Sequence, residues 1–561
     1  MYNKLLTSLF TICLIGISCK NKADKDLDVA ISHNPQDIEI GQITFEQHCS
    51  SCHFFGQDDI GPSLSGITRK VDVDWLKKFI RNPRNTANSG DERAVALVKK
   101  YKVYMPDFNH LTDSEIEDIL AYLHTYEISK SNNSDDSLIS IKNPIKSIIG
   151  YAKDTANLEF VGQVPSSDVK APFTRINKLG CDKASGRIFI NDLRGAMYEL
   201  KNGKLNLYLS LKEMRPAFID QPGMATGFGS FALHPEFLKN GLFYTTHTEK
   251  AGTAIADFTL PDSVPVKLQW VITEWKSKQP KSNQFSGVSR EILRFDFVAS
   301  SHGLQEIAFN PTVDSSHPDY GKLYIALGDG GAVQVGYPNL AYHKGREVWG
   351  SILRIDPLGN NSRNKKYSIP LDNPFTQSKT LLNEIWAYGF RNANRMSWDS
   401  MGRMLVSDIG QANIEELNVV KPGEFYGWPI REGRFLFDFN GSFNKIYPLP
   451  ENDSIFSITY PIIQYDHDDG VAISGGFTSK GEKFKEKYIF GDIASGNIYI
   501  SDLAYNAVPI VKQLKVNFKN KITTINEMAK SSRADLKFGM GCNGTIYIFT
   551  KADGKIYKLR E

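Results

Sequence analysis

Tyr320-Gly-Lys-Leu-Tyr-Ile-Ala326 is one of six similar stretches in which a tight turn leads into alternating apolar residues. The other five are Ser185-Gly-Arg-Ile-Phe-Ile-Asn191, Asn240-Gly-Leu-Phe-Tyr-Thr245, Met401-Gly-Arg-Met-Leu-Val-Ser407, Lys485-Glu-Lys-Tyr-Ile-Phe-Gly491 and Asn543-Gly-Thr-Ile-Tyr-Ile-Phe549. Such a turn is typical of a β-hairpin, and its repetition at irregular spacings is typical of propeller blades with insertions. The repeat therefore predicts an all-β, six-bladed propeller over residues 158–561. A pair of β-sandwiches is the alternative, but it gives no reason for one hairpin to recur six times.

The composition is that of a globular protein rich in strands. The 561 residues include 44 glycines, and 11% are aromatic, which favours strands joined by tight turns. Lys and Arg together number 66 and Asp and Glu 63, which leaves a net charge of +3. This balance excludes an intrinsically disordered chain and gives no electrostatic basis for a nucleic-acid partner. The length also predicts more than one domain.

The first residues have the anatomy of an export signal. Lys4 precedes an apolar stretch over 5–17 that is too short for a permanent membrane helix, and Ser18 lies before Cys19. Gly-Ile-Ser-Cys19 resembles a bacterial lipobox, although Gly16 stands where leucine is usual. We therefore expect a signal peptide over 1–18, lipidation of Cys19, and an exported, periplasmic or membrane-attached bacterial lipoprotein. Its membrane contact would be the lipid alone. A cleaved signal with an incidental cysteine is the alternative.

A polar linker over 19–40 leads to Cys49-Ser-Ser-Cys52-His53, which is the Cys-x-x-Cys-His pattern of c-type haem attachment. Cys49 and Cys52 would bind one haem covalently, and His53 would bind its iron. A thioredoxin-like pair does not need the histidine. A zinc site needs two further ligands that the neighbouring sequence does not offer.

A second iron ligand is expected from the same small domain. Met105-Pro106 precedes a stretch that the capping pattern of Thr112 and Glu115 predicts to be a helix ending near Leu123. A methionine on the loop before a C-terminal helix resembles monohaem cytochromes c, and this resemblance covers residues 41–127 and implies a small all-α domain. Met105 would be the axial ligand, with a core methionine as the alternative.

Residues 128–157 have the composition of an interdomain linker. Beyond them, nine fragments in order resemble the glucose/sorbosone dehydrogenase family, the soluble sugar dehydrogenases that use pyrroloquinoline quinone (PQQ). They are 231–237, 302–311, 326–331, 350–356, 369–375, 388–392, 408–411, 426–429 and 491–499. Among them are Ala326-Leu-Gly-Asp-Gly-Gly331, Tyr388-Gly-Phe-Arg-Asn392 and Tyr426-Gly-Trp-Pro429.

This resemblance implies a set of site residues. It implies that His302 is the catalytic base and that Asp329 orients its imidazole. It also places Arg391 and Asn392 beside the quinone oxygens. A structural histidine and a turn aspartate are the alternatives for the first two.

The remaining implied contacts concern cofactor binding. The backbone carbonyls of Gly410 and Gln411 would bind Ca²⁺. Arg533 lies near the expected carboxylate-binding arginines of PQQ, but Ala494 stands where the family's glucose dehydrogenases have a lysine. Because buried carboxylates of PQQ need cationic partners, this departure puts PQQ retention in question.

Together these features predict an exported quinohaemoprotein with haem c, PQQ and Ca²⁺. It would oxidise a sugar or alcohol and pass electrons through the haem to a downstream periplasmic or membrane acceptor. The alternative is a non-catalytic propeller that binds carbohydrate or protein and carries an electron-transfer cytochrome c.

Two further cysteines lie in matching positions of the first and last predicted blades. Cys181 and Cys542 each precede a repeated hairpin, and export would permit a disulfide between them. Two buried free thiols are the favoured expectation, because equivalent positions in adjacent blades can exceed the limit of about 7 Å between bridged Cα atoms.

Overall fold

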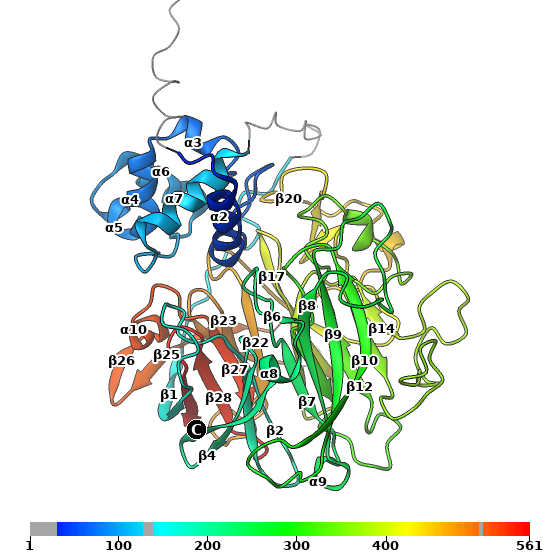
Figure 1. The fold of residues 1–561 in the computed structure, drawn as a ribbon. Helices are drawn as coiled ribbons and strands as arrows, with labels where there is room; N and C mark the ends of the chain where they lie inside the picture. Colours follow the sequence, from blue (N-terminus) through cyan, green and yellow to red (C-terminus); the bar gives the residue numbers. More distant parts are fainter. Residues whose placement is uncertain (1–30, 127–138, 504–508, 561) are drawn as a thin grey trace, which may run out of the picture.

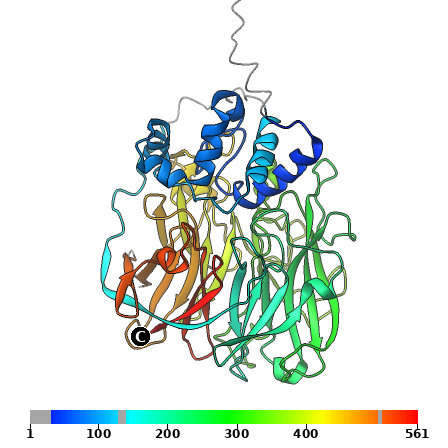
Figure 2. The same ribbon diagram turned by 60° about the vertical axis from the view of Figure 1, so that its left-hand side comes forward.

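The computed structural model describes residues 31–126, 139–503 and 509–560. A helical N-terminal domain lies on one face of a large β domain (Figures 1 and 2). The predicted signal peptide and Cys19 lie outside the described residues. Within the described part, no helix has the length and apolar character needed to cross a membrane.

The helical domain is built around two crossing helices, α2 and α7. Its elements are α2 (Pro35–His48), α3 (Ile67–Lys70), α4 (Val73–Arg81), α5 (Pro83–Asn88), α6 (Glu92–Tyr101) and α7 (Asp113–His124). Gly41 permits the close crossing, because a Cβ there would lie 1.8 Å from the Asp118 carbonyl oxygen. Thr112 and Glu115 form the predicted capping box of α7. Helix α2 begins at Pro35, inside the range expected to be a linker.

The β domain is a six-bladed propeller, as the repeat predicts. The first three blades are β2 (Ile176–Cys181), β3 (Ile188–Asp192), β4 (Ala196–Lys201) and β5 (Lys204–Ser210); β7 (Ser230–Leu233), β8 (Leu242–Lys250), β9 (Leu268–Ser277) and β10 (Gly287–Phe297); and β11 (Glu306–Phe309), β12 (Leu323–Ala326), β13 (Ser351–Ile355) and β14 (Ile385–Tyr388).

The next three blades complete the ring. They are β15 (Ala393–Trp398), β16 (Met404–Asp408), β17 (Ile414–Val420) and β21 (Ile463–Asp466); β22 (Ile473–Thr478), β23 (Lys487–Asp492), β24 (Ile498–Asp502) and β25 (Val511–Phe518); and β27 (Leu536–Met540), β28 (Ile546–Thr550), β29 (Lys555–Arg560) and β1 (Tyr151–Gln163). The inner strands β2, β7, β11, β15, β22 and β27 pack side by side around the axis.

Shorter elements decorate the blades. They are α8 (Leu211–Met214), β6 (Phe218–Ile219), α9 (Phe237–Asn240), the 3-10 helices Pro338–Leu340 and Asp453–Phe456, β18 (Arg431–Glu432), β19 (Phe435–Phe437), β20 (Ile446–Tyr447), β26 (Lys521–Thr523) and α10 (Ile525–Ala529). Strands β18, β19 and β20 form a small separate sheet in the insertion between β17 and β21.

Each of the six sequence repeats forms the second strand of one blade. The turn residue before each of these strands has a positive φ: Gly186 74°, Gly241 73°, Gly321 72°, Gly402 76°, Glu486 62° and Gly544 85°. Glycine adopts this left-handed conformation without the steric cost of a Cβ atom, which explains its use in five of the six turns.

The ring is closed by strand β1. It pairs antiparallel with β29 of the last blade and also runs parallel to β25 of the blade before. Its first residue, Tyr151, lies within the expected linker of 128–157, because pairing with β25 already begins there.

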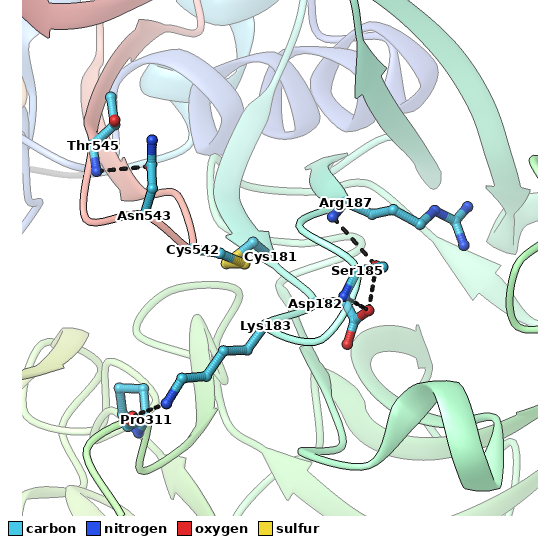
Figure 3. Close-up of a disulfide and its surroundings, with 9 residues drawn as sticks. All are labelled: Cys181, Asp182, Lys183, Ser185, Arg187, Pro311, Cys542, Asn543 and Thr545. Atoms are coloured by element: carbon cyan, nitrogen blue, oxygen red, sulfur yellow. Dashed lines mark hydrogen bonds between the residues drawn. A yellow bond between two sulfur atoms is a disulfide. The ribbon is translucent and has the colours of Figure 1, made fainter.

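The expectation of free thiols at Cys181 and Cys542 is wrong. The two residues form a disulfide with a Cα separation of 5.7 Å (Figure 3). Their approach follows from ring closure, because β2, which ends at Cys181, packs beside β27, whose last residue is Met540. The bond closes a loop with a sequence separation of 361 residues. In the chain-entropy description, a loop of this size contributes about 6 kcal/mol to stability.

Candidate active site between the two domains

The Cys-x-x-Cys-His segment follows the last turn of α2. Both thiols are free, Cys49 is buried, and Cys52 is half-buried. His53 Nδ1 lies 3.0 Å from the carbonyl oxygen of Pro62. A proton on Nδ1 would be donated to that carbonyl, which leaves Nε2 as the atom available to a metal.

Gly61 and Met105 complete the surroundings of this segment. A Cβ on Gly61 would lie 2.5 Å from His53 Cε1, so the imidazole ring rests against a backbone that has room only for glycine. Met105 is half-buried and packs against the apolar core that includes Cys49. Two free thiols, an oriented imidazole and a neighbouring thioether fit a covalently attached haem.

The helical domain is bound to the propeller by ion pairs between the two domains. Ion pairs join Lys102 to Asp468 at 2.8 Å, Glu115 to Lys170 at 2.7 Å and Glu46 to Lys267 at 3.0 Å. Between the domains lies a cavity of about 990 Å³. Its lining includes Cys52 from the helical domain and His302 and Arg391 from the propeller. The structure therefore brings the Cys-x-x-Cys-His segment and the predicted base to one cavity.

His302 and Asp329 form a buried dyad at this cavity. His302 lies on the connection from β10 of the second blade to β11 of the third blade. Asp329 lies on the connection from β12 to β13 within the third blade. His302 Nδ1 is 2.6 Å from Asp329 Oδ1, while Asp329 Oδ2 accepts a hydrogen bond from Trp428 Nε1 at 2.9 Å. The backbone of His302 has a φ of 49°, a costly conformation for a residue with a side chain.

The electrostatics of the dyad keep the imidazole neutral. Burial and the charge of Arg391 lower the pKa of His302 below 6.5, against the opposing effect of Asp329. Burial alone would raise the pKa of Asp329, but His302, Arg391 and Trp428 outweigh it and lower that pKa. A neutral imidazole bonded through Nδ1 can accept a proton at Nε2.

Arg391 and Asn392 are held by the carboxylate of Asp408. The backbone N–H groups of Arg391 and Asn392 donate to Asp408 at 2.9 and 2.6 Å. Both residues line the cavity, and Asn392 Oδ1 is buried without a hydrogen-bond partner among the described residues. An orphaned buried acceptor facing a cavity is typical of a site that receives a polar ligand.

The loop of Gly410 and Gln411 is organised by Glu432. Glu432 Oε1 accepts the backbone N–H groups of Gln411, Ala412, Asn413 and Ile414 at 2.8 to 3.1 Å. Gly410 and Gln411 line the cavity. In the described parts of the chain, no group of three or more His, Cys, Asp or Glu side chains is placed to hold a metal ion. Binding of Ca²⁺ at this loop would therefore depend on the backbone carbonyls of Gly410 and Gln411.

Three cationic side chains of the last blade line the cavity. Arg533 donates to Asp535 at 2.6 Å. Lys537 on β27 is 6% exposed, and neither its ammonium group nor that of Lys551 forms a hydrogen bond or salt bridge with any residue that the structure describes. Burial, with neighbouring cations, lowers the pKa of Lys537 well below its usual value. Both lysines lack carboxylate partners among the described residues, so an anionic ligand in the cavity would favour their charged forms, and they would take the place of the lysine that Ala494 replaces.

Several of these residues were not identified from the sequence. Lys537 stands in an apolar strand, Leu-Lys-Phe, on the innermost position of a blade, and such a lysine is a detectable signal. Glu432 and Lys551 carry no comparable signal, because their roles depend on contacts with distant segments.

A second histidine that lines the same cavity, His467, also forms a dyad with a buried carboxylate. His467 lies between β21 and β22, and its Nε2 is 3.3 Å from Oε1 of Glu415, which is fully buried on β17. Burial lowers the pKa of His467, but the hydrogen bond and charge of Glu415 outweigh it and raise the pKa above 6.5.

Comparisons with known proteins identify both domains. Residues 182–558 match the family model described as Glucose / Sorbosone dehydrogenase, and residues 38–127 match the one described as Cytochrome c. The HIPL1 protein of Arabidopsis thaliana is 28% identical over 326 residues, which are 50% of this chain and 45% of that protein. The aldose sugar dehydrogenase YliI of Escherichia coli K12 is 23% identical over 385 residues, 66% of this chain and 88% of the relative.

The fold has a solved counterpart. A crystal structure of glucose dehydrogenase superposes with a TM-score of 0.52 at 16% identity and covers 72% of this chain and 99% of its own. The chain spans less than half the length of HIPL1, 45%. The propeller match covers most of the sequence, and the helical match covers the domain that precedes it. The chain therefore belongs to the glucose/sorbosone dehydrogenase family and carries a cytochrome c domain before its propeller.

Proposed function

We propose that the protein is an exported dehydrogenase that oxidises a sugar or alcohol at the propeller and passes the electrons to a haem c on the helical domain. The observation that carries the proposal is the shared cavity, whose lining includes His302, Arg391 and Cys52. A tethered one-electron carrier at the same cavity can accept the electrons of a two-electron oxidation one after the other.

The helical domain would hold the haem through residues that its fold already orients. Cys49 and Cys52 would form the thioether bonds, and His53 would bind the iron through Nε2, because its Nδ1 is turned to Pro62. Met105 would be the second axial ligand. Met105→Ala should leave the haem covalently attached but shift the iron towards high spin. If the Met105→Ala variant kept the spectrum of a methionine-ligated haem, a different methionine would be the axial ligand.

The propeller would hold PQQ through the cationic side chains of its last blade, two of which are unpaired among the described residues. Lys537, Lys551 and Arg533 would pair with the carboxylates, and Arg391 and Asn392 would lie beside the quinone oxygens. The backbone carbonyls of Gly410 and Gln411 would bind Ca²⁺, whose preference for oxygen ligands they meet. The orphaned Asn392 Oδ1 and the two unpaired lysines support this assignment, because both need a ligand of matching polarity.

When bound, PQQ supplies a two-electron acceptor that the protein's own side chains lack. His302 Nε2 would take the proton of the substrate hydroxyl. Asp329 would hold the imidazole in the productive tautomer and stabilise it once charged. The guanidinium of Arg391 would face the oxygen on which negative charge develops.

Reconstitution tests the proposal directly. Purified protein lacking PQQ is mixed with PQQ and Ca²⁺, and haem reduction is followed while a panel of aldoses and alcohols is added. Substrate-dependent reduction of the haem is the expected result. If PQQ at saturating concentration does not bind and the haem is not reduced, the result would instead favour a non-catalytic carbohydrate- or protein-binding propeller. In the active protein, a downstream periplasmic or membrane acceptor would reoxidise the haem.

A further inference from the structure

Asp59 of the cytochrome c domain enters the propeller's candidate site. Its side chain is 2% exposed, and its Oδ2 accepts a hydrogen bond from Gln411 Nε2 at 3.0 Å. A longer contact of 3.5 Å comes from Gln334 Nε2. Its Oδ1 is buried without a partner in the described part of the chain. The charge of Arg391 and the contacts with the propeller amides are what offset the burial of this carboxylate.

On one side, Asp59 is tied to the haem-attachment segment. Its backbone N–H donates to the carbonyl of Gly61 at 2.9 Å, and the N–H of Gly61 donates to the carbonyl of Cys52 at 2.8 Å. Gly61 is also the residue against which the His53 ring rests. The position of Asp59 is thus fixed by the loop that orients the candidate iron ligand.

On the other side, Asp59 is linked to Arg391 through a single side chain. Gln411 Oε1 accepts from Arg391 Nε at 3.0 Å, while Gln411 Nε2 donates to Asp59. Gln411 is 1% exposed, so water cannot replace either partner without opening the interface. Loss of the acceptor at Asp59 would leave a buried N–H group unsatisfied and free the amide to turn away from Arg391.

We propose that Asp59 is a positioning residue through which the cytochrome c domain completes the propeller's cofactor pocket: docking fixes Gln411, and Gln411 fixes Arg391. The inference rests on the proposed function, because it assigns Arg391 to PQQ. It adds that the two domains form one site, so the propeller alone would present Arg391 in a less ordered state.

The test compares Asp59→Ala with Asp59→Asn in the full chain containing haem. Both variants remove the negative charge, but asparagine keeps an oxygen that can accept from Gln411. The difference between them therefore isolates the hydrogen bond. Lys170→Ala is the matched control, because it breaks the interdomain ion pair with Glu115 and does not contact Gln411. Haem absorbance first confirms that all the proteins carry the same haem content.

Two measurements are made on each protein. PQQ affinity is titrated in the presence of Ca²⁺ by quenching of tryptophan fluorescence. Hydrogen–deuterium exchange of the segments 55–61 and 409–414 is measured without PQQ. We expect PQQ to bind about tenfold more weakly to Asp59→Ala than to Asp59→Asn, the effect of one buried hydrogen bond. Exchange should be faster in both segments of Asp59→Ala only.

The outcomes separate this inference from the proposed function. Equal affinities and equal exchange for the alanine and asparagine variants would overturn it. So would Lys170→Ala reproducing the loss, since any weakening of docking would then be sufficient. If the unmodified protein binds no PQQ, the proposed function fails, and the exchange comparison by itself decides whether Asp59 orders the Gln411 loop.

Discussion

Two histidines that line the cavity each form a dyad with a buried carboxylate, and their pKa values shift in opposite directions. His302 and His467 occupy equivalent places in the propeller, because each lies on the connection from the fourth strand of one blade to the first strand of the next. Each is bonded to a buried carboxylate, at 2.6 Å for Asp329 and 3.3 Å for Glu415.

The charges around each imidazole determine the direction in which its pKa shifts. Burial and Arg391 lower the pKa of His302, whereas Glu415, Glu432 and Asp492 outweigh burial and raise the pKa of His467. The same pair of residue types therefore yields one histidine whose pKa is lowered, which favours the neutral form that accepts a proton, and one whose pKa is raised, which favours the charged form. The difference teaches that the neighbouring charges, rather than the dyad itself, define the base.

The largest expected effect comes from removing the neutral histidine. His302→Ala should lower substrate-dependent haem reduction by about 10²–10⁴-fold, the usual contribution of a general base, while PQQ still binds. Stopped-flow absorbance of the haem measures the rate. Turnover at the normal rate in this variant would break the comparison and make His467 the first candidate for the base.

A smaller loss is expected when the orienting carboxylate is made neutral. Asp329→Asn keeps the size of the side chain but weakens the charge-assisted bond to His302 Nδ1, so the rate should fall about tenfold to a hundredfold. Glu415→Gln is the matched change in the other dyad. The same rate assay should show a larger loss for Asp329→Asn, and the reverse order would contradict the assignment.

The pH profile distinguishes the two dyads without any mutation. Because the pKa of His302 is lowered, its neutral form persists as the pH falls through 6.5, and kcat/KM should stay level there and decline only at lower pH. A base at His467, whose pKa is raised, would lose activity already above 6.5. Steady-state rates between about pH 5 and 8 decide between them, provided that the haem spectrum shows an intact protein.

The smallest effect is expected at His467 itself. His467→Gln keeps a donor for Glu415, so the rate of haem reduction should change by no more than about fivefold, the effect of one altered hydrogen bond. Thermal unfolding serves as the control for lost stability. A drop as large as that of His302→Ala in a stably folded variant would show that both dyads handle protons.

Much of the fold could be predicted from short stretches of sequence. The six turns predicted the six blades because a left-handed turn followed by alternating apolar residues is determined by neighbours in the chain. The capping box of α7 was equally local. The pairing of Cys181 with Cys542 was not predictable in this way, because it depends on how closely β2 and β27 approach when the ring closes.

The residues of the candidate site also divide into those that the sequence identified and those that only the structure revealed. The family resemblance named His302, Asp329 and Arg391, and the structure brings all three to one cavity or its wall. It did not name Lys537 or Lys551, whose lack of partners is visible only once the neighbouring blades are in place. Nor did it name Glu432, which holds a loop about twenty residues away in the chain.

By itself the sequence determined the Cys-x-x-Cys-His segment, the six-bladed ring and the order of the two domains. Each of these follows from contiguous residues whose spacing fixes local backbone geometry. Only the tertiary structure decided that the cytochrome c domain reaches into the propeller, where Asp59 meets Gln411 across a separation of 352 residues. The direction in which the pKa of each histidine shifts was decided there too, since a pKa depends on burial and on charges that the fold brings near.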